Sequence, residues 1–212
     1  MKKTLLLTLL TCLSLYSVEM REGTFQVALT PQFTEQKSLE FANGASAHIN
    51  ASSSIELMFG YNINSFIELA VLMNSNSSNY EGTRVYDSGK KEQYSENLTT
   101  SSFSFSGTYN IFEDNFTPFI ETHIGSTFVD SGVETGEEGG GCWVDPWYGY
   151  VCSSTNATYT DTKMSYGASI GVRYDFENRL FLKAAYSKHY IDFNSNNSPD
   201  FNNYRLSVGS TF

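Results

Sequence analysis

The alternation of side chains at the carboxyl end of the chain constrains the fold more than any other feature. Counting back from Phe212, every second residue is apolar or small, and the residues between them are polar or glycine. The first set is Tyr204, Leu206, Val208, Ser210 and Phe212, and the second is Arg205, Ser207, Gly209 and Thr211. Because successive side chains of a β-strand point to opposite faces, this period of two predicts a strand with one apolar and one polar face. An ordinary antiparallel edge strand would alternate in the same way.

Seven further segments show the same alternation, and polar connections separate them. They span residues 24–30, 50–61, 67–73, 102–111, 118–128, 163–174 and 180–187. In the fourth of these, Phe103 and Phe105 alternate with the hydroxyl residues Ser102, Ser104 and Ser106. A row of hydroxyl groups is unusual in an apolar core but is expected in the polar interior of a membrane-spanning β-barrel. With the last strand the segments number eight, an even count and the smallest usual size for such a barrel.

The connections between the segments alternate between short and long. Short turns cover 62–64, 112–116 and 175–179, and longer polar loops cover 34–46, 75–98, 130–161 and 191–200. A barrel with both termini in the periplasm has short turns on that side and long loops outside the cell. Aromatic residues collect at the short-turn ends, as at a membrane interface: Tyr61, Phe66, Phe112, Phe116, Tyr174, Phe176 and Phe212. The predicted fold class is all-β, an eight-stranded antiparallel up-and-down transmembrane β-barrel.

The amino-terminal residues have the composition of a secretory signal peptide. A basic start precedes the apolar run 4–15, and Ser17 offers a small residue for cleavage. The run is shorter than the about 20 apolar residues that a membrane-spanning helix needs. Cys12 lacks the small residues that usually precede a lipidated cysteine, so we assign it to the discarded leader. The predicted organisation is a signal peptide over 1–17 and one barrel domain over 18–212.

The charge balance excludes one class of partner. The formal charge is −10, and it becomes −12 once Lys2 and Lys3 leave with the leader. Nucleic acids require a basic face on the protein, so we expect no nucleic-acid partner. The run 134–141 is acidic and rich in glycine, but it lacks the ligand spacing of a calcium loop. We expect that run to be a solvated segment, and we expect neither a metal nor a cofactor.

The inward faces of the predicted strands carry charged residues of both signs. The set comprises Glu56, Glu68, Glu121, His123, Lys163, Arg173, Lys183 and Arg205. The acids lie on earlier strands than the bases, so the two signs would face each other across the lumen. An eight-stranded barrel has room inside for side chains and little else, and buried charges need partners. We expect a salt-bridge network that plugs the lumen; a gated ion path along the same residues is the alternative interpretation.

Cys142 and Cys152 lie in the longest loop and are the only cysteines left once the leader is removed. An exported protein meets an oxidising compartment, so we expect a disulfide between them. The residues between them include Trp143, Trp147, Tyr148 and Tyr150. Rigid aromatic side chains on a tethered loop are typical of a contact site. The alternative is that they pack on the loop stem or against lipopolysaccharide.

The pattern as a whole resembles the small eight-stranded bacterial outer-membrane proteins that are similar to the barrel domain of outer-membrane protein A. The resemblance covers nearly the whole mature chain, and its most specific parts are residues 165–176 and the C-terminal strand. It implies a monomer in the bacterial outer membrane, in contact with lipid and lipopolysaccharide, and no peptidoglycan-binding domain after the barrel. In such proteins the barrel assembly machinery reads the final strand, and that role would fall to Tyr204, Leu206, Val208 and Phe212.

The resemblance indicates architecture better than function, and two functions stay open. We expect the extracellular loops to serve envelope integrity, or binding to a host or another cell surface, without catalysis. The alternative is modification of lipid A, since some barrels of this size have that activity. Ser187 and His189 share the inward face near the outer rim, but two residues apart on one strand is about 7 Å, beyond hydrogen-bond reach. The nearest acids, Asp192 and Asp200, lie in a loop, and Lys188 is predicted to face lipopolysaccharide phosphate.

Overall fold

The computed structural model describes residues 21–40, 46–85, 91–145, 149–192 and 199–212. Among these residues, eight strands form a barrel: β1 (Phe25–Thr34), β4 (Ser52–Asn62), β5 (Ile67–Val85), β6 (Lys91–Asn110), β7 (Phe116–Asp145), β8 (Gly149–Asp175), β9 (Leu180–Ile191) and β10 (Asp200–Thr211). Two short strands, β2 (Lys37–Glu40) and β3 (Ser46–Ile49), form a hairpin that is joined to the sheet through the pairing of β3 with β5. The predicted signal peptide lies outside the described residues.

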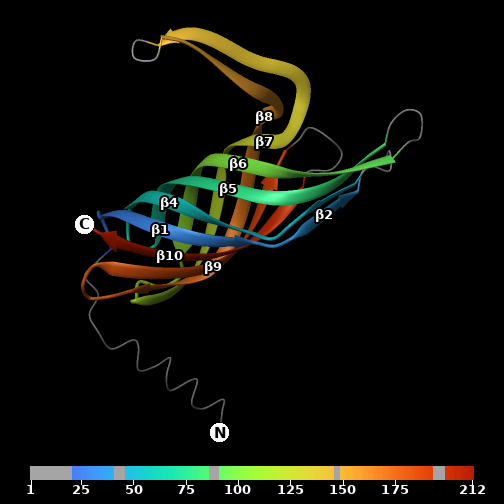
Figure 1. Cartoon of the computed structure of the whole chain (residues 1–212). Helices are drawn as coiled ribbons and strands as arrows, with labels where there is room; N and C mark the ends of the chain where they lie inside the picture. Colours follow the sequence, from blue (N-terminus) through green and yellow to red (C-terminus); the bar gives the residue numbers. More distant parts are fainter. Residues whose placement is uncertain (1–20, 41–45, 86–90, 146–148, 193–198) are drawn as a thin grey trace.

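The eight strands close into a cylinder in which every neighbouring pair is antiparallel (Figure 1). Around the barrel the order is β1, β4, β5, β6, β7, β8, β9 and β10. The last strand returns to the first, with Val27 opposite Ser210. Closure gives each strand two partners, so its backbone groups are satisfied in a medium without water. The predicted eight-stranded barrel is confirmed.

The two faces of the cylinder have opposite chemistry. Outside, apolar side chains form a belt in which Phe105 is 59% exposed, Ile170 63% and Val208 53%. Inside, most buried side chains are polar or charged. A small cluster of buried apolar residues comprises Ala28, Met58, Ala70, Leu72 and Phe181. Exposing the outer belt to water would cost about 25 cal/mol per Å² of apolar surface, whereas lipid tails accept it. The described residues contain no helix long and apolar enough to cross a membrane.

Short turns connect the strands at one end of the barrel, where the sequence predicts them. They cover residues 63–66, 111–115 and 176–179. In the first turn the side-chain oxygen of Asn64 accepts hydrogen bonds from the backbone N–H groups of Phe66 and Ile67, at 2.9 and 2.8 Å. Asparagine suits such a turn because its side chain can bond the backbone two residues on. Tyr61 and Phe112 are exposed at this end, as an interfacial aromatic belt requires.

The opposite end differs from the prediction, because much of the predicted polar loops is paired strand. The β5–β6 hairpin continues to the pair Val85–Lys91, and the β7–β8 hairpin continues to Asp145–Gly149. The β2–β3 hairpin adds to the extension of β5. In Figure 1 the β5–β6 extension and β2 project past the rim opposite the C-terminus, and the β7–β8 hairpin arches away from the wall. One face of the β5 extension is buried, as at Ser78 and Tyr80. The residues of β5 after Met73 are mostly polar, so the apolar–polar alternation that marks the membrane strands is missing there.

The packing of the interior can be tested at Gly209 of β10. A methyl group at Gly209 would stand 2.3 Å from the Phe181 ring and 2.5 Å from the Val27 carbonyl oxygen. Gly209→Ala should therefore lower the free energy of unfolding by about 1–3 kcal/mol, the usual cost of overpacking. On the outer wall, a methyl group at Gly107 would meet only Leu69, at 3.8 Å, so Gly107→Ala is the matched control. Urea unfolding, followed by heat-modifiable gel mobility, measures the stability of both variants. Equal stabilities of Gly209→Ala and Gly107→Ala would contradict the close packing at Gly209.

Candidate functional site

Two groups of buried ion pairs lie in the lumen. The first is centred on Arg173 of β8, which is fully buried. Its guanidinium donates hydrogen bonds to the carboxylates of Glu68 and Asp175, each at 2.8 Å, and to the side-chain oxygen of Gln26 at 3.1 Å. The Phe181 ring lies 4.4 Å from the guanidinium carbon. A planar guanidinium can hold acceptors from three strands at once, which a lysine ammonium does less well.

Lys183 of β9 and Arg21 extend this group. The Lys183 ammonium donates to both oxygens of Glu68, at 2.6 and 2.7 Å. Arg21 lies four residues before β1 and is 3% exposed. It donates to two backbone carbonyl oxygens of the β6–β7 turn, each at 3.0 Å, and lies 3.5 Å from Asp175. The first group therefore reaches from the middle of the lumen to the end with the short turns.

The second group is centred on Arg205 of β10 and lies closer to the extracellular end. Arg205 pairs with Glu56 of β4 at 2.5 Å and with Glu121 of β7. Glu121 also accepts hydrogen bonds from the hydroxyl groups of Ser169 and Thr108, at 3.3 and 3.4 Å. Each of these buried carboxylates has a cationic partner, which is the condition under which a buried charge is tolerated.

Six of the eight residues predicted for a lumen network belong to these two groups: Glu56, Glu68, Glu121, Arg173, Lys183 and Arg205. Lys163 does not. It lies opposite Thr127, beyond both groups along the lumen, and pairs with Asp161 at 2.7 Å. The hydrogen bond from Lys163 lowers the pKa of Asp161, which is exposed outside the apolar belt. His123 faces the lumen but contacts His189 instead of a carboxylate.

Arg21, Gln26 and Asp175 are members of the first group that the sequence analysis missed. Asp175 follows Arg173 by two residues and therefore shares its inward face, but it stands where the turn was predicted to begin. Gln26 alternates with Phe25 and Val27 in the first segment, but nothing in the sequence indicates its partner. Arg21 precedes the first alternating residue, so no period-two signal marks it. The shared face of Asp175 and Arg173 was the one available clue.

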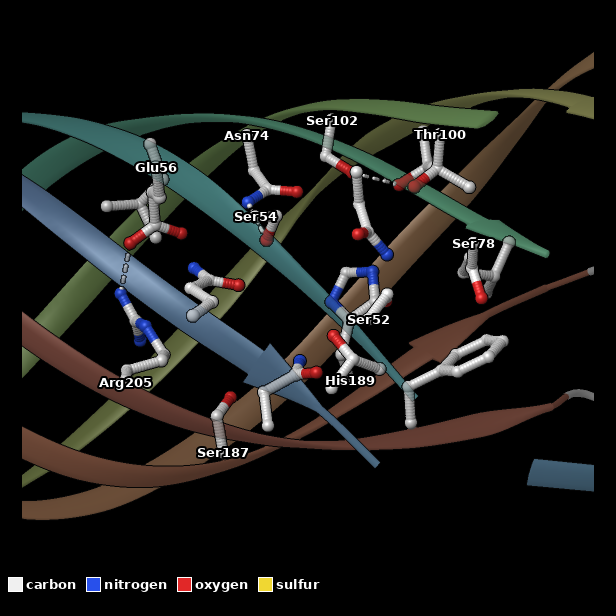
Figure 2. Close-up of a pocket in the computed structure, with 18 of the residues that line it drawn as sticks. Ser52, Ser54, Glu56, Asn74, Ser78, Thr100, Ser102, Ser187, His189 and Arg205 are labelled. Carbon is white, nitrogen blue, oxygen red and sulfur yellow. Dashed lines mark hydrogen bonds and ion pairs between the residues drawn. The ribbon is translucent and has the colours of Figure 1, made fainter. Parts of the chain in front are cut away.

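On the extracellular side of Arg205 the lumen opens into a cavity of about 80 Å³, which we term the vestibule (Figure 2). Its wall carries many hydroxyl and amide side chains, among them Ser52, Ser54, Asn74, Ser78, Thr100 and Ser102. Buried polar atoms of the wall that lack a hydrogen-bond partner among the described residues include Ser52 Oγ, Asn76 Oδ1, His123 Nδ1 and Asn203 Oδ1. Such atoms need water or a bound molecule. The vestibule therefore combines polar groups that need water or a ligand with apolar side chains such as Leu72 and Ile191.

His123 of β7 and His189 of β9 meet at the wall of the vestibule. Both lie opposite Gly167 of the intervening strand β8. Nε2 of His123 lies 2.9 Å from Nδ1 of His189. The ring planes differ by 17°, and the 5.2 Å between ring centroids exceeds the N···N distance by about two ring radii, so the rings meet edge to edge. Within the described ranges, no three His, Cys, Asp or Glu residues lie close enough to hold a metal ion together.

Ser187 and His189, the residues considered for lipid A chemistry, are not assembled with an acid. The ring nitrogen Nδ1 of His189 bonds the other histidine. Asp200 is held by Lys37 and Lys188 at 2.5 and 2.8 Å. Hydrogen bonds from Lys188 and Lys37 lower the pKa of Asp200, at the rim outside the apolar belt, to about 2. A serine nucleophile needs a base in contact and an acid behind that base, and the described contacts do not supply this arrangement.

Removing the central arginine should cost far more than removing the outlying lysine. Arg173→Met leaves Glu68 and Asp175 buried with fewer partners, so the free energy of unfolding should fall by about 3–5 kcal/mol. Lys163→Met removes a pair at the rim and should cost at most about 1 kcal/mol. Urea unfolding of both variants, followed by circular dichroism, gives the comparison. Similar losses in the two variants would show that the lumen pairs are not what holds the barrel together.

Residues 5–212 of the chain match the family model described as outer membrane protein beta-barrel domain. The crystal structure of the outer membrane protein OprG from Pseudomonas aeruginosa has a TM-score of 0.56 and 11% identity, covering 90% of this chain and 96% of that chain. Ail of Yersinia pestis, in complex with the heparin analogue sucrose octasulfate, has a TM-score of 0.51 and 11% identity, covering 90% and 99%. At this identity the likeness shows the fold alone. No curated protein matches the chain in sequence.

Proposed function

The chain belongs to the outer membrane protein beta-barrel domain family, and on this premise we propose that its lumen is closed and that it acts through its extracellular strands. It resides in the bacterial outer membrane, where lipid covers the apolar belt. The proposed role is contact with a surface outside the cell or support of the envelope, without catalysis. The carrying observation is the contrast between buried ion pairs that bridge the lumen and hairpins that extend far beyond the barrel.

The two ion-pair groups support a closed lumen. Arg173 reaches from β8 to Glu68 on β5, and Arg205 reaches from β10 to carboxylates on β4 and β7. Each arginine therefore bridges strands that are not neighbours, at two levels along the axis. The interior of an eight-stranded barrel is just wide enough for side chains to fill. An ion that crossed would have to displace contacts of 2.5–2.8 Å at both levels.

Planar-bilayer recording tests the closure. The wild-type protein should show no large, steady conductance, because both levels are bridged. The double variant Arg173→Ser/Arg205→Ser, where it folds, should produce brief openings because it removes the arginine bridge at both levels, whereas Arg205→Ser alone should stay closed. Lys163→Ser, which changes a rim lysine outside both groups, should record like the wild type. A stable nanosiemens-scale channel in the wild type would refute the closed lumen.

The end of the β7–β8 hairpin is the proposed contact site. Backbone pairing sets Cys142 directly opposite Cys152. Directly opposite residues have Cα atoms about 4.5–5.5 Å apart, within the about 4.4–6.8 Å that a disulfide spans. This register supports a disulfide, which the oxidising exterior would preserve. The proposed contact residues are Trp143 and Tyr150 together with Trp147 and Tyr148, which lie outside the described residues. A closed ring would hold them together and lower the entropy cost of binding.

Replacement of both cysteines tests this contact site. Non-reducing peptide mapping of the wild type should find Cys142 and Cys152 joined. Cys142→Ser with Cys152→Ser should leave heat-modifiable mobility unchanged, because the barrel strands lie elsewhere, and should weaken adhesion to host cells severalfold. Ser153→Ala with Ser154→Ala, in the same hairpin, is the matched control and should bind like the wild type. Free cysteine thiols in the wild type would contradict the proposed disulfide. Undiminished adhesion of the Cys142→Ser/Cys152→Ser variant would show that the hairpin is not the contact site.

The negative charge of the chain limits the chemical class of ligand that we propose. Ail is described with a sulfated heparin analogue. The present chain carries a formal charge of −10. Three of its glutamates lie within residues 134–138 of β7, close in sequence to the proposed contact site. Like charges repel over about 8–10 Å at physiological ionic strength, so a polyanion is disfavoured. We propose a neutral or basic ligand on the host or on a neighbouring cell.

The remaining proposed partners belong to the membrane itself. Lys188 stays 45% exposed while it pairs with Asp200, so its ammonium can also meet lipopolysaccharide phosphate. The side chains proposed as the assembly signal face outward, where the assembly machinery could contact them: Tyr204, Leu206, Val208 and Phe212. We propose a monomer, since closure leaves none of the membrane strands with a free edge for a second copy.

A further inference from the structure

We propose that His123 and His189 bind a divalent transition-metal ion at the wall of the vestibule. The inference goes beyond the proposed function, since neither a closed lumen nor an extracellular contact requires a metal. It rests on the row His123–Gly167–His189, in which three neighbouring strands bring two imidazoles into contact inside the barrel. The sequence pattern predicts no metal, because the two histidines stand 66 residues apart.

The row depends on the glycine at its centre. A Cβ atom at Gly167 would lie 2.6 Å from Nε2 of His123, the nitrogen that faces His189. It would also lie 2.3 Å from the backbone carbonyl oxygen of Lys188. Any larger residue at Gly167 would therefore push the His123 ring off the position where it meets His189. The contact of the two imidazoles is built into the strand sequence.

The spacing of the facing nitrogens suits two neighbouring positions around one ion. Metal–imidazole bonds are about 2.0–2.1 Å long. Two nitrogens 2.9 Å apart then subtend nearly a right angle at a shared ion. Right angles between neighbouring ligands are usual in the tetragonal sites of Cu²⁺ and Ni²⁺. The rings now meet edge to edge with one proton between the facing nitrogens. When the ion replaces this hydrogen bond, that proton moves to the other nitrogen of its own ring, and opposed rotations about the Cβ–Cγ bonds would turn both lone pairs toward the vestibule.

The bond between the two rings does not satisfy all of their nitrogens. Nδ1 of His123 is buried without a hydrogen-bond partner among the described residues, and the side chain as a whole is only 9% exposed. The pair is therefore not a self-sufficient bond between two satisfied rings. Toward the lumen, the positive charge of Arg205 is paired with the carboxylates of Glu56 and Glu121. Imidazole nitrogens select Cu²⁺, Ni²⁺ or Zn²⁺ over Mg²⁺ and Ca²⁺, which prefer oxygen ligands.

The site offers two protein ligands, and the vestibule supplies the rest as water. In the part of the chain that the structure describes, no set of three His, Cys, Asp or Glu residues forms a metal cluster. An ion held by two imidazoles and water exchanges easily. We therefore expect a chelator to remove it while the barrel stays folded.

Copper is the probe for the test, with protein expressed without a histidine tag and folded in detergent. Titration with Cu²⁺, followed by electron paramagnetic resonance, should show one ion per chain with couplings from two nitrogens. His123→Asn and His189→Asn should each weaken Cu²⁺ binding by roughly tenfold or more. Loss of a residue that only hydrogen-bonds to a metal ligand already costs about tenfold in affinity, and loss of the ligand itself should cost at least as much. His48→Asn is the control, because His48 is the remaining histidine of the chain. It lies outside the barrel in β3 and is hydrogen-bonded to Ser38.

Heat-modifiable mobility shows which variants are folded, and Gly167→Ala provides a second test that keeps both histidines. If it folds, it should also weaken Cu²⁺ binding. Coupling to fewer than two nitrogens in the wild type, or unchanged affinity in the double His123→Asn/His189→Asn variant, would overturn the proposal and mean that the pair shares only a proton. Loss of binding in His48→Asn would overturn it too. Conductance and adhesion do not depend on the metal, so failure here leaves the proposed function standing.

Discussion

A chain that crosses lipid must pair every backbone N–H and C=O group within itself, and the rest of this structure depends on that requirement. An open sheet has unpaired backbone groups along its two edge strands, and the pairing of β1 with β10 removes both edges. Once the sheet is closed, the strand period commits every second side chain to a narrow lumen. The chemistry of the interior then has to be satisfied by side chains that come from different strands.

The interior meets this demand in two ways. Arg173 and Arg205 each gather carboxylates from across the lumen, so that buried charge is balanced at two levels. Close packing is met by setting a bulky side chain over a glycine of the next strand, as Phe181 lies over Gly209. The contact of His123 with His189 over Gly167 follows the same rule. Stability and the candidate metal site therefore arise from one packing principle.

The membrane strands could be predicted because lipid and lumen impose opposite chemistry on neighbouring residues, as at Ser104 and Phe105. The same alternation predicted which side of its strand each charged residue of the lumen occupies. It did not predict the partner of each charge, because contacts across a barrel depend on the register of every strand between them. Arg173 meets Glu68, and Lys163 stands apart, for that reason. The extracellular strand extensions could not be predicted either, since their residues are mostly polar and show no apolar–polar alternation.

The seam between β1 and β10 sets an order of events. Phe25 and Phe212 exchange backbone hydrogen bonds across it, at 3.0 and 2.9 Å. Each of the other interfaces joins strands that follow one another around the barrel in order of synthesis, so each can form from a short stretch of chain. The seam alone closes a loop of nearly the whole described chain and can form only after the last strand is made. Until then the sheet has two unpaired edges and incomplete ion pairs, so closure of the barrel has to await the synthesis and export of β10.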